Sequence, residues 1–133
     1  MAAEAINVRV SSPSYQAYQI LHIAYSVAPI VAGLDKFYHF LVNWDTYLSP
    51  IVPSTLGITA HSFMVGVGVI EVLAGLLVAV VPRYGGWVVG LWLIGIIINL
   101  LSIPAYFDIA LRDFGLALGA FALSRLSAEY SAV

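Results

Sequence analysis

The sequence predicts an all-α, polytopic membrane protein, a four-transmembrane-helix bundle that runs up and down. Of its 133 residues, 62% are hydrophobic and 9% are charged, whereas soluble domains are about half apolar and a quarter charged. The mean hydropathy of +0.98 agrees with this class. The apolar residues fall into four stretches separated by polar or proline-containing segments, and each stretch approaches the roughly 20 residues that cross a bilayer.

The first fourteen residues, 1–14, are expected to form a polar tail that Pro13 separates from the first span at about 15–36. A cleaved signal peptide is the competing interpretation, because the residues SVA at 26–28 resemble a small-residue cleavage site. Pro29 directly after such a cut argues against it.

The segment 43–56 is expected to be an interfacial loop on the outer side. Trp44 and Tyr47 are aromatic residues typical of the membrane boundary. Pro50 and Pro53 prevent a continuous helix.

Three further spans are expected at about 57–81, 87–103 and 105–126, with a short turn, PRYGG, at 82–86 and a tail at 127–133. Short connections make consecutive helices antiparallel neighbours, which gives the up-and-down bundle.

Both termini and the PRYGG turn then share one side of the membrane. The cations are divided between the two sides as Arg9, Arg83 and Arg125 against Lys36 and Arg112. Since positive residues are enriched on the cytoplasmic side, we expect an integral, multi-pass protein of the cell (cytoplasmic) membrane with both termini in the cytoplasm.

Small residues predict where the helices pack. Hydrocarbon gives helices no hydrophobic drive to associate, so close backbone contact through small residues supplies it. The residues expected in such contacts are Gly66, Gly68, Gly75, Gly90, Gly95, Gly115, Gly119 and Ala120.

Two polar residues are expected at similar depth inside the membrane. Glu71 lies about 16 Å from the outer end of its span, and Asn99 about 18 Å from the inner end of the next one. A hydrogen bond from a protonated Glu71 to Asn99 is the least costly way to bury the acid.

The other charged residues gather near the outer boundary. They are Asp35, Lys36, His39, His61, Asp108, Arg112 and Asp113. Matched depths predict the pairs Lys36 with Asp113 and Asp35 with Arg112, which would fix helix register. The alternative is a polar pocket for a quinone head group, a lipid or a small anion.

The charge and cysteine counts exclude other chemistry. Five Lys and Arg against seven Asp and Glu leave no basic face for nucleic acid, and without cysteine there is no thiolate ligand or nucleophile. His39 and His61 are the pair at one depth that haem ligation needs. A bond between Asp35 and His39, four apart on one helix face, is the alternative; no metal or haem is expected, since no metal-binding spacing is present.

Three segments resemble DoxX-like membrane proteins (the DoxX/DoxD family). GLDKF at 33–37 resembles their G-x-x-K segment, IEVLAGLLVAVVPR at 70–83 their E-x-x-x-G second helix and basic turn, and YFDIALRDFGLALGAFAL at 106–123 the polar start of their last helix. The resemblance covers about 18–126. The loop 43–56 is longer and more aromatic than the family pattern.

The resemblance implies a four-helix membrane fold. It also implies a link to membrane oxidoreductase complexes, including subunits associated with thiosulfate and quinone chemistry. Lys36, Glu71 and Arg83 match the family's polar positions. A family likeness of this kind argues the fold better than the reaction.

The function we expect is that of a small integral accessory subunit of a larger respiratory-type or oxidoreductase complex. The chain would have a structural role or line a quinone or lipid site, without a redox centre or intrinsic cofactor of its own. Its partners would be other membrane subunits and the lipid bilayer. An assembly factor for membrane proteins shares most of these features.

The alternative enzyme is a stand-alone quinone-reactive oxidoreductase. Glu71 or Asp113 would be its proton relay, and Lys36, His39 or His61 would lie near the head group.

The alternative transporter would move protons or a small solute past Glu71 and Asn99. It needs a polar route to the inner face, for which His22 and Gln19 are the candidates.

Overall fold

The computed structural model describes residues 12–130, which contain helices and connecting segments without a strand. The long helices are α2 (Pro13–Tyr38), α4 (Ala60–Val80), α5 (Pro82–Leu101) and α6 (Phe107–Tyr130). Between them lie the short helices η1 (Trp44–Tyr47), α3 (Ile51–Leu56) and η2 (Pro104–Tyr106). The all-α prediction is therefore confirmed for the described part of the chain.

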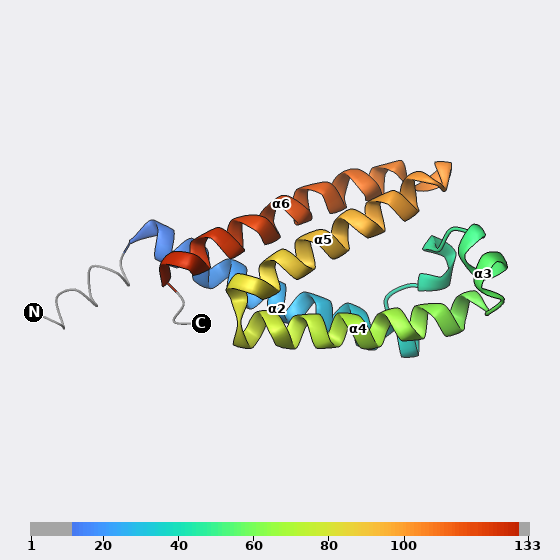
Figure 1. The fold of residues 1–133 in the computed structure, drawn as a ribbon, viewed down its shortest axis with the longest axis horizontal. Coiled ribbons are helices and arrows are strands. Elements are labelled where there is room, and N and C mark those ends of the chain that lie inside the picture. Colours follow the sequence, from blue (N-terminus) through green and yellow to red (C-terminus); the bar gives the residue numbers. More distant parts are fainter. Residues whose placement is uncertain (1–11, 131–133) are drawn as a thin grey trace, which may run out of the picture.

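The long helices form two antiparallel pairs, α2 with α4 and α5 with α6 (Figure 1). The pairs meet near the junction of α4 and α5 and diverge toward the end of the molecule that carries α3. At the opposite end the start of α2 contacts the end of α6, where the rings of Tyr15 and Tyr130 are 5.3 Å apart. The α3 end and the Tyr130 end are therefore built differently.

Three of these helices, α2, α4 and α5, are long and apolar enough to cross a membrane. Helix α6 has 24 residues and a more polar composition. Large apolar side chains are exposed along the surface, including Ile23 on α2, Leu73 on α4 and Leu91 on α5. Surface of this kind suits a hydrocarbon surrounding.

Helix α2 begins two residues earlier than expected because the sequence caps it. The Ser12 side chain accepts a hydrogen bond from the Tyr15 amide, and Pro13 occupies the first turn, where its missing N–H is not needed. The helix ends at Tyr38, and the capping residue His39 is left-handed with a φ of 52°. Residues 1–11 of the expected tail lie outside the described part of the chain.

The expected turn at 82–86 is not a turn. Helix α5 begins at Pro82, directly after Val81. Proline fits the first helical turn. A Cβ on Gly86 would lie 2.8 Å from the Ala120 carbonyl oxygen, so glycine allows α5 to approach α6 here.

The expected loop at 43–56 contains η1 and α3. Pro53 lies in the first turn of α3, where no amide hydrogen bond is lost. At the other end of the chain, the first four residues of the expected tail at 127–133 belong to α6, and the Ser127 hydroxyl donates to the Leu123 carbonyl over 2.7 Å. Residues 131–133 lie outside the described range.

Glycines set the closest helix contacts, as predicted. A Cβ on Gly33 would lie 2.5 Å from the Gly68 carbonyl oxygen, and the reverse distance is 2.6 Å. The prediction is also confirmed at Gly75, Gly90 and Gly119. It is wrong at Gly66, Gly95 and Gly115, where a Cβ would meet nothing within 4 Å.

Candidate functional site

A buried ion pair joins α2 to α4. Lys36 Nζ lies 2.7 Å from Glu71 Oε1, and the two side chains are 4% and 9% exposed. Lys36 lies three residues after the contact glycine of α2, Gly33, and Glu71 lies three residues after the contact glycine of α4, Gly68. Residues three apart share a helix face. The glycine crossing therefore brings the two charged side chains together one turn further along.

The position of Lys36 corrects two predictions. Glu71 lies about 16 Å along α4 from Ala60, so Lys36 is level with the middle of α4 and not with its outer end. Helix α2 ends at Tyr38, while α4 continues well past that level. The predicted pair of Lys36 with Asp113 is wrong, because Glu71 takes the ammonium group.

Trp44 covers the same ion pair. The Lys36 ammonium lies 4.0 Å from the centroid of the Trp44 ring, a favourable cation–π distance. Trp44 Nε1 donates to Asp35 Oδ2 over 2.7 Å. The segment after α2 thus folds back over the buried cation.

Asp35 caps the end of α2 and does not pair with Arg112, so that prediction is also wrong. Its carboxylate accepts from the amides of Phe40 at 2.8 Å and Leu41 at 3.0 Å. Because these amides directly follow the helix in sequence, they lie close to the Asp35 carboxylate and occupy it in place of a side chain from α6.

Asp113 brings α6 to the buried pair. It is 4% exposed and lies within electrostatic range of Glu71. The Arg112 guanidinium donates to Asp113 Oδ1 at 3.1 and 3.2 Å. Trp92 on α5 is also within reach of the Glu71 carboxylate, although its buried indole nitrogen has no hydrogen bond of ordinary geometry.

We call Lys36, Glu71, Trp44 and Asp113 the inner cluster. Its members come from α2, α4, η1 and α6, so one small volume connects most of the fold. Chemically the cluster contains opposite charges in contact, the arrangement expected of a group that holds helices in register.

The predicted hydrogen bond between Glu71 and Asn99 is wrong. The Asn99 side chain accepts from the Ser49 amide at 2.9 Å and donates to the Tyr47 carbonyl at 2.6 Å. Asn99 thereby ties α5 to the segment between η1 and α3. The predicted equal depth is wrong as well. Helix α5 begins at Pro82 and not near Trp87, so from the junction of α4 and α5 Asn99 lies about 26 Å along α5, whereas Glu71 lies about 14 Å along α4.

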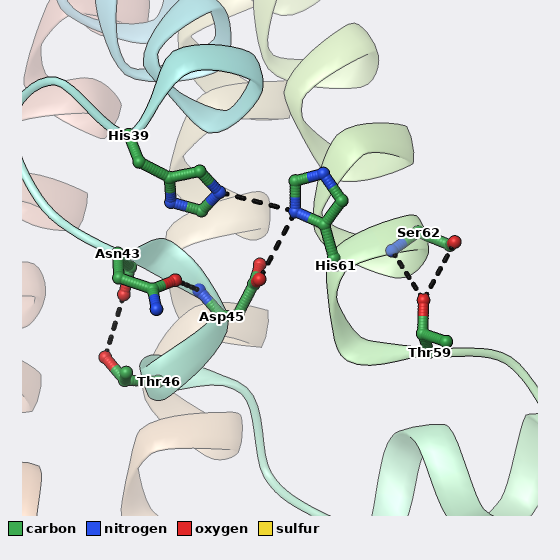
Figure 2. A network of polar contacts seen from close by, with 7 residues as sticks. All are labelled: His39, Asn43, Asp45, Thr46, Thr59, His61 and Ser62. Atoms are coloured by element: carbon green, nitrogen blue, oxygen red, sulfur yellow. Dashed lines mark hydrogen bonds and ion pairs between the residues drawn. The ribbon is translucent and has the colours of Figure 1, made fainter.

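His39 and His61 face one another, as their predicted depth required. Their ring centroids are 5.2 Å apart, and the Asp45 carboxylate of η1 contacts the His61 ring (Figure 2). The predicted side-chain bond between Asp35 and His39 is not formed; the His39 amide instead donates to the Asp35 carbonyl at 2.6 Å. We call His39, Asp45 and His61 the outer cluster.

The polar residues toward the Tyr130 end of the molecule have local partners. His22 Nε2 lies 3.0 Å from the Val78 carbonyl oxygen, and Gln19 donates to the Tyr15 hydroxyl at 2.7 Å. The Arg83 carbonyl accepts from the Ser124 hydroxyl. These contacts hold helix ends together.

Sequence reasoning missed Asp45, Trp92 and the role of Trp44. Trp44 was interpreted only as a boundary aromatic, although a Trp nine residues after Asp35-Lys36 offers both an N–H donor and a cation-binding face. Asp45 carries a signal in retrospect, since it is an acid within a short aromatic segment between two histidine-bearing helix ends.

Comparisons of the chain with protein-family models, with curated proteins and with solved structures give no match. The resemblance to DoxX-like proteins therefore stays a prediction that depends on the quoted motifs.

Proposed function

We propose that the chain is a four-span membrane protein that acts as a small accessory subunit of a larger membrane oxidoreductase complex. Helix α6 is the fourth span in this proposal. Two observations support this assignment of α6. Asp113 is buried against the other helices, whereas Leu111 and Leu118 are 73% and 54% exposed. The Asp113 carboxylate faces inward and these large apolar side chains face outward, as expected of a lipid-embedded helix, while the 64% exposed Arg112 side chain reaches back to Asp113.

The observation that carries the proposal is a pair of outward glycines within apolar helix faces. Gly95 on α5 lies between the exposed Leu91 and Ile98, and Gly115 on α6 lies between Leu111 and Leu118. Residues at i−4 and i+3 share a face with the central residue. Small residues on such faces allow another helix to approach closely, so both faces suit partner subunits.

The inner cluster supports a non-catalytic role. Lys36 and Glu71 already satisfy one another, and a paired acid is a poor proton relay. In this proposal the cluster holds α2, α4 and α6 in register while the outer surfaces bind partners and lipid. The chain needs no redox centre for that role.

A second candidate function is binding of a quinone or lipid head group beside the inner cluster. The buried Trp92 indole nitrogen favours it, because this donor lies beside the Glu71 carboxylate without a hydrogen bond of ordinary geometry, and the carbonyl oxygen of a head group would accept from it. The site would form one wall of a pocket shared with a partner subunit.

The partner test is purification of the chain in mild detergent with mass spectrometry of its companions. We expect stoichiometric co-purification with redox subunits. Gly115→Leu should reduce the recovered partners, whereas the control Phe114→Leu, at an exposed position about 100° around α6, should not. A homogeneous, partner-free protein would contradict the proposal.

The topology test uses the absence of native cysteine. The proposal places both termini in the cytoplasm and the segment 43–56 outside. A membrane-impermeant maleimide should therefore label Ser54→Cys in intact cells and Ala128→Cys only after permeabilisation. Labelling of both in intact cells would contradict four spans.

A further inference from the structure

The outer cluster neighbours the inner one and lies where the end of α2, η1 and the start of α4 come together, toward the end of the molecule that carries α3 (Figure 1). His39 follows the end of α2, Asp45 lies in η1 and His61 lies in the first turn of α4. His61 Nδ1 is 3.3 Å from His39 Nε2 and 3.2 Å from Asp45 Oδ2 (Figure 2). One ligand atom from each of the three residues falls within 4.8 Å of the others.

The protons of neutral rings do not satisfy these contacts. A neutral imidazole has one N–H and one lone pair. If the proton is on His61 Nδ1, a single N–H is shared between His39 and Asp45. If His39 Nε2 donates instead, His61 Nδ1 turns its lone pair toward the Asp45 carboxylate, and the two lone pairs repel. A cation, by contrast, attracts all three groups at once.

Unpaired buried atoms point the same way. Asp45 Oδ1 and His39 Nδ1 are buried and have no hydrogen-bond partner among residues 12–130. Such orphaned groups are uncommon in folded proteins. An ion bound to the Asp45 carboxylate would explain Oδ1, while the His39 nitrogen proposed as a ligand is the other one, Nε2. The carboxylate therefore has an oxygen to spare in addition to the one that faces His61.

The spacing fits a tetrahedral ion. With metal–nitrogen and metal–oxygen distances of about 2.0–2.2 Å, neighbouring donor atoms in a tetrahedral zinc site lie about 3.3–3.5 Å apart. The two contacts of His61 are already close to this value. Small rotations of the imidazole and carboxylate groups are enough to direct the lone pairs to a common point.

We propose that His39, Asp45 and His61 bind one Zn²⁺ ion through His39 Nε2, His61 Nδ1 and the Asp45 carboxylate. Two imidazoles and one carboxylate suit zinc, whereas Mg²⁺ and Ca²⁺ prefer oxygen ligands alone. The His61 side chain is 54% exposed, so water reaches the ion and supplies the fourth ligand. This site is independent of the proposed partner-binding role.

The backbone holds these ligands before an ion arrives. His39 adopts the left-handed conformation at the end of α2, and Asp45 follows Asn43, whose side chain accepts from the Asp45 amide at 3.2 Å. His61 follows Thr59, whose hydroxyl accepts from the Ser62 amide at 3.1 Å (Figure 2). Caps on three separate elements thus fix the positions of all three ligands.

The test is zinc binding to the full-length chain, purified in detergent with a tag that contains no histidine. Metal analysis and calorimetric titration with Zn²⁺ should give one ion per chain. X-ray absorption of the zinc-loaded protein should show nitrogen and oxygen donors at about 2.0–2.2 Å with imidazole scattering. This readout needs no variant.

Variants then assign the ligands. Loss of a supporting residue around a metal typically costs 10–100-fold in affinity, so we expect at least about 100-fold for loss of a ligand in Asp45→Asn, His61→Asn or His39→Asn. Asparagine tolerates the left-handed conformation at position 39. The matched control is His22→Gln, which removes the third histidine and should bind zinc like the parent.

Circular dichroism and gel filtration confirm that each variant is folded before titration. The proposal is overturned if the folded parent binds no zinc, if X-ray absorption shows no imidazole, or if His22→Gln weakens binding as much as His61→Asn does.

Discussion

The inner and outer clusters both join α2 to α4, but they differ in how their charges balance. In the inner cluster an ammonium group meets a carboxylate at 2.7 Å, and both side chains are almost fully buried. In the outer cluster a carboxylate and two imidazoles present more lone pairs than protons, and His61 is half exposed. Lys36 and His39 are only three residues apart, so one helix end serves both clusters.

The comparison shows what burial requires of a polar group in a membrane protein. A buried charge is tolerated when its partner is part of the same chain. A cluster with a half-exposed member such as His61 is not under that requirement, since groups from outside the chain can reach it. We therefore expect the inner cluster to determine stability and the outer cluster to determine ligand binding.

The largest expected effect comes from Glu71→Leu, which leaves the Lys36 ammonium buried without its carboxylate. Removal of one partner from a buried pair typically costs about 3–5 kcal/mol. The free energy of unfolding, measured by SDS titration in detergent with circular dichroism, should fall by that amount. An unchanged value would mean that the pair does not hold the helices.

Gly68→Ala tests the crossing that sets the inner cluster. The new Cβ would lie 2.6 Å from the Gly33 carbonyl oxygen, a backbone atom that moves only if α2 moves. Overpacking of this kind costs about 1–3 kcal/mol in the same SDS titration. The matched control is Gly66→Ala two residues earlier, where the space is open and alanine favours the helix by up to about 1 kcal/mol.

Asn99→Leu tests the connection between the two clusters. Asn99 holds the segment that contributes Trp44 to the inner cluster and Asp45 to the outer one. Two backbone groups, on Tyr47 and Ser49, would lose their partner, at about 1–3 kcal/mol. Hydrogen exchange of residues 43–56 should rise as well. The control Ile98→Leu, at the neighbouring exposed position, should change neither quantity.

The smallest expected effect is that of His61→Asn without zinc. Exposed substitutions usually change stability by about 0.5 kcal/mol or less. With zinc present, thermal unfolding should shift upward for the parent but not for the variant, because a ligand stabilises only the state that binds it. If His61→Asn greatly lowered the free energy of unfolding in metal-free solution, the prediction would be contradicted, because the outer cluster would then have the structural role that we assign to the inner one.

The sequence predicted the features that depend on local spacing. The helical class, the mid-helix depth of Glu71, the facing of His39 and His61, and the contact at Gly68 all follow from periodicity and distance along one helix. These features survive because helical rise is nearly constant.

Sequence reasoning failed where two helices must be aligned with one another. The depth of Lys36 depends on how far α4 extends beyond α2, which no spacing within α2 reveals. The turn at 82–86 was wrong because Pro82 fits a helix start as well as a break. Partner choice for Asp35 and Asn99 was wrong because neighbouring backbone amides and carbonyls compete with distant side chains.

The central claim is that Lys36 and Glu71 are each other's main charged partner and that this ion pair holds α2 against α4. The most direct measurement is the unfolding free energy of the double variant Lys36→Met/Glu71→Leu, compared with the parent and both single variants. If the pair is closed, the double variant should recover most of the loss of the single variants, since a buried pair replaced by apolar residues is often neutral or stabilising. A double variant that loses the sum of both single losses would contradict the claim, because each residue would then act on a group other than its partner.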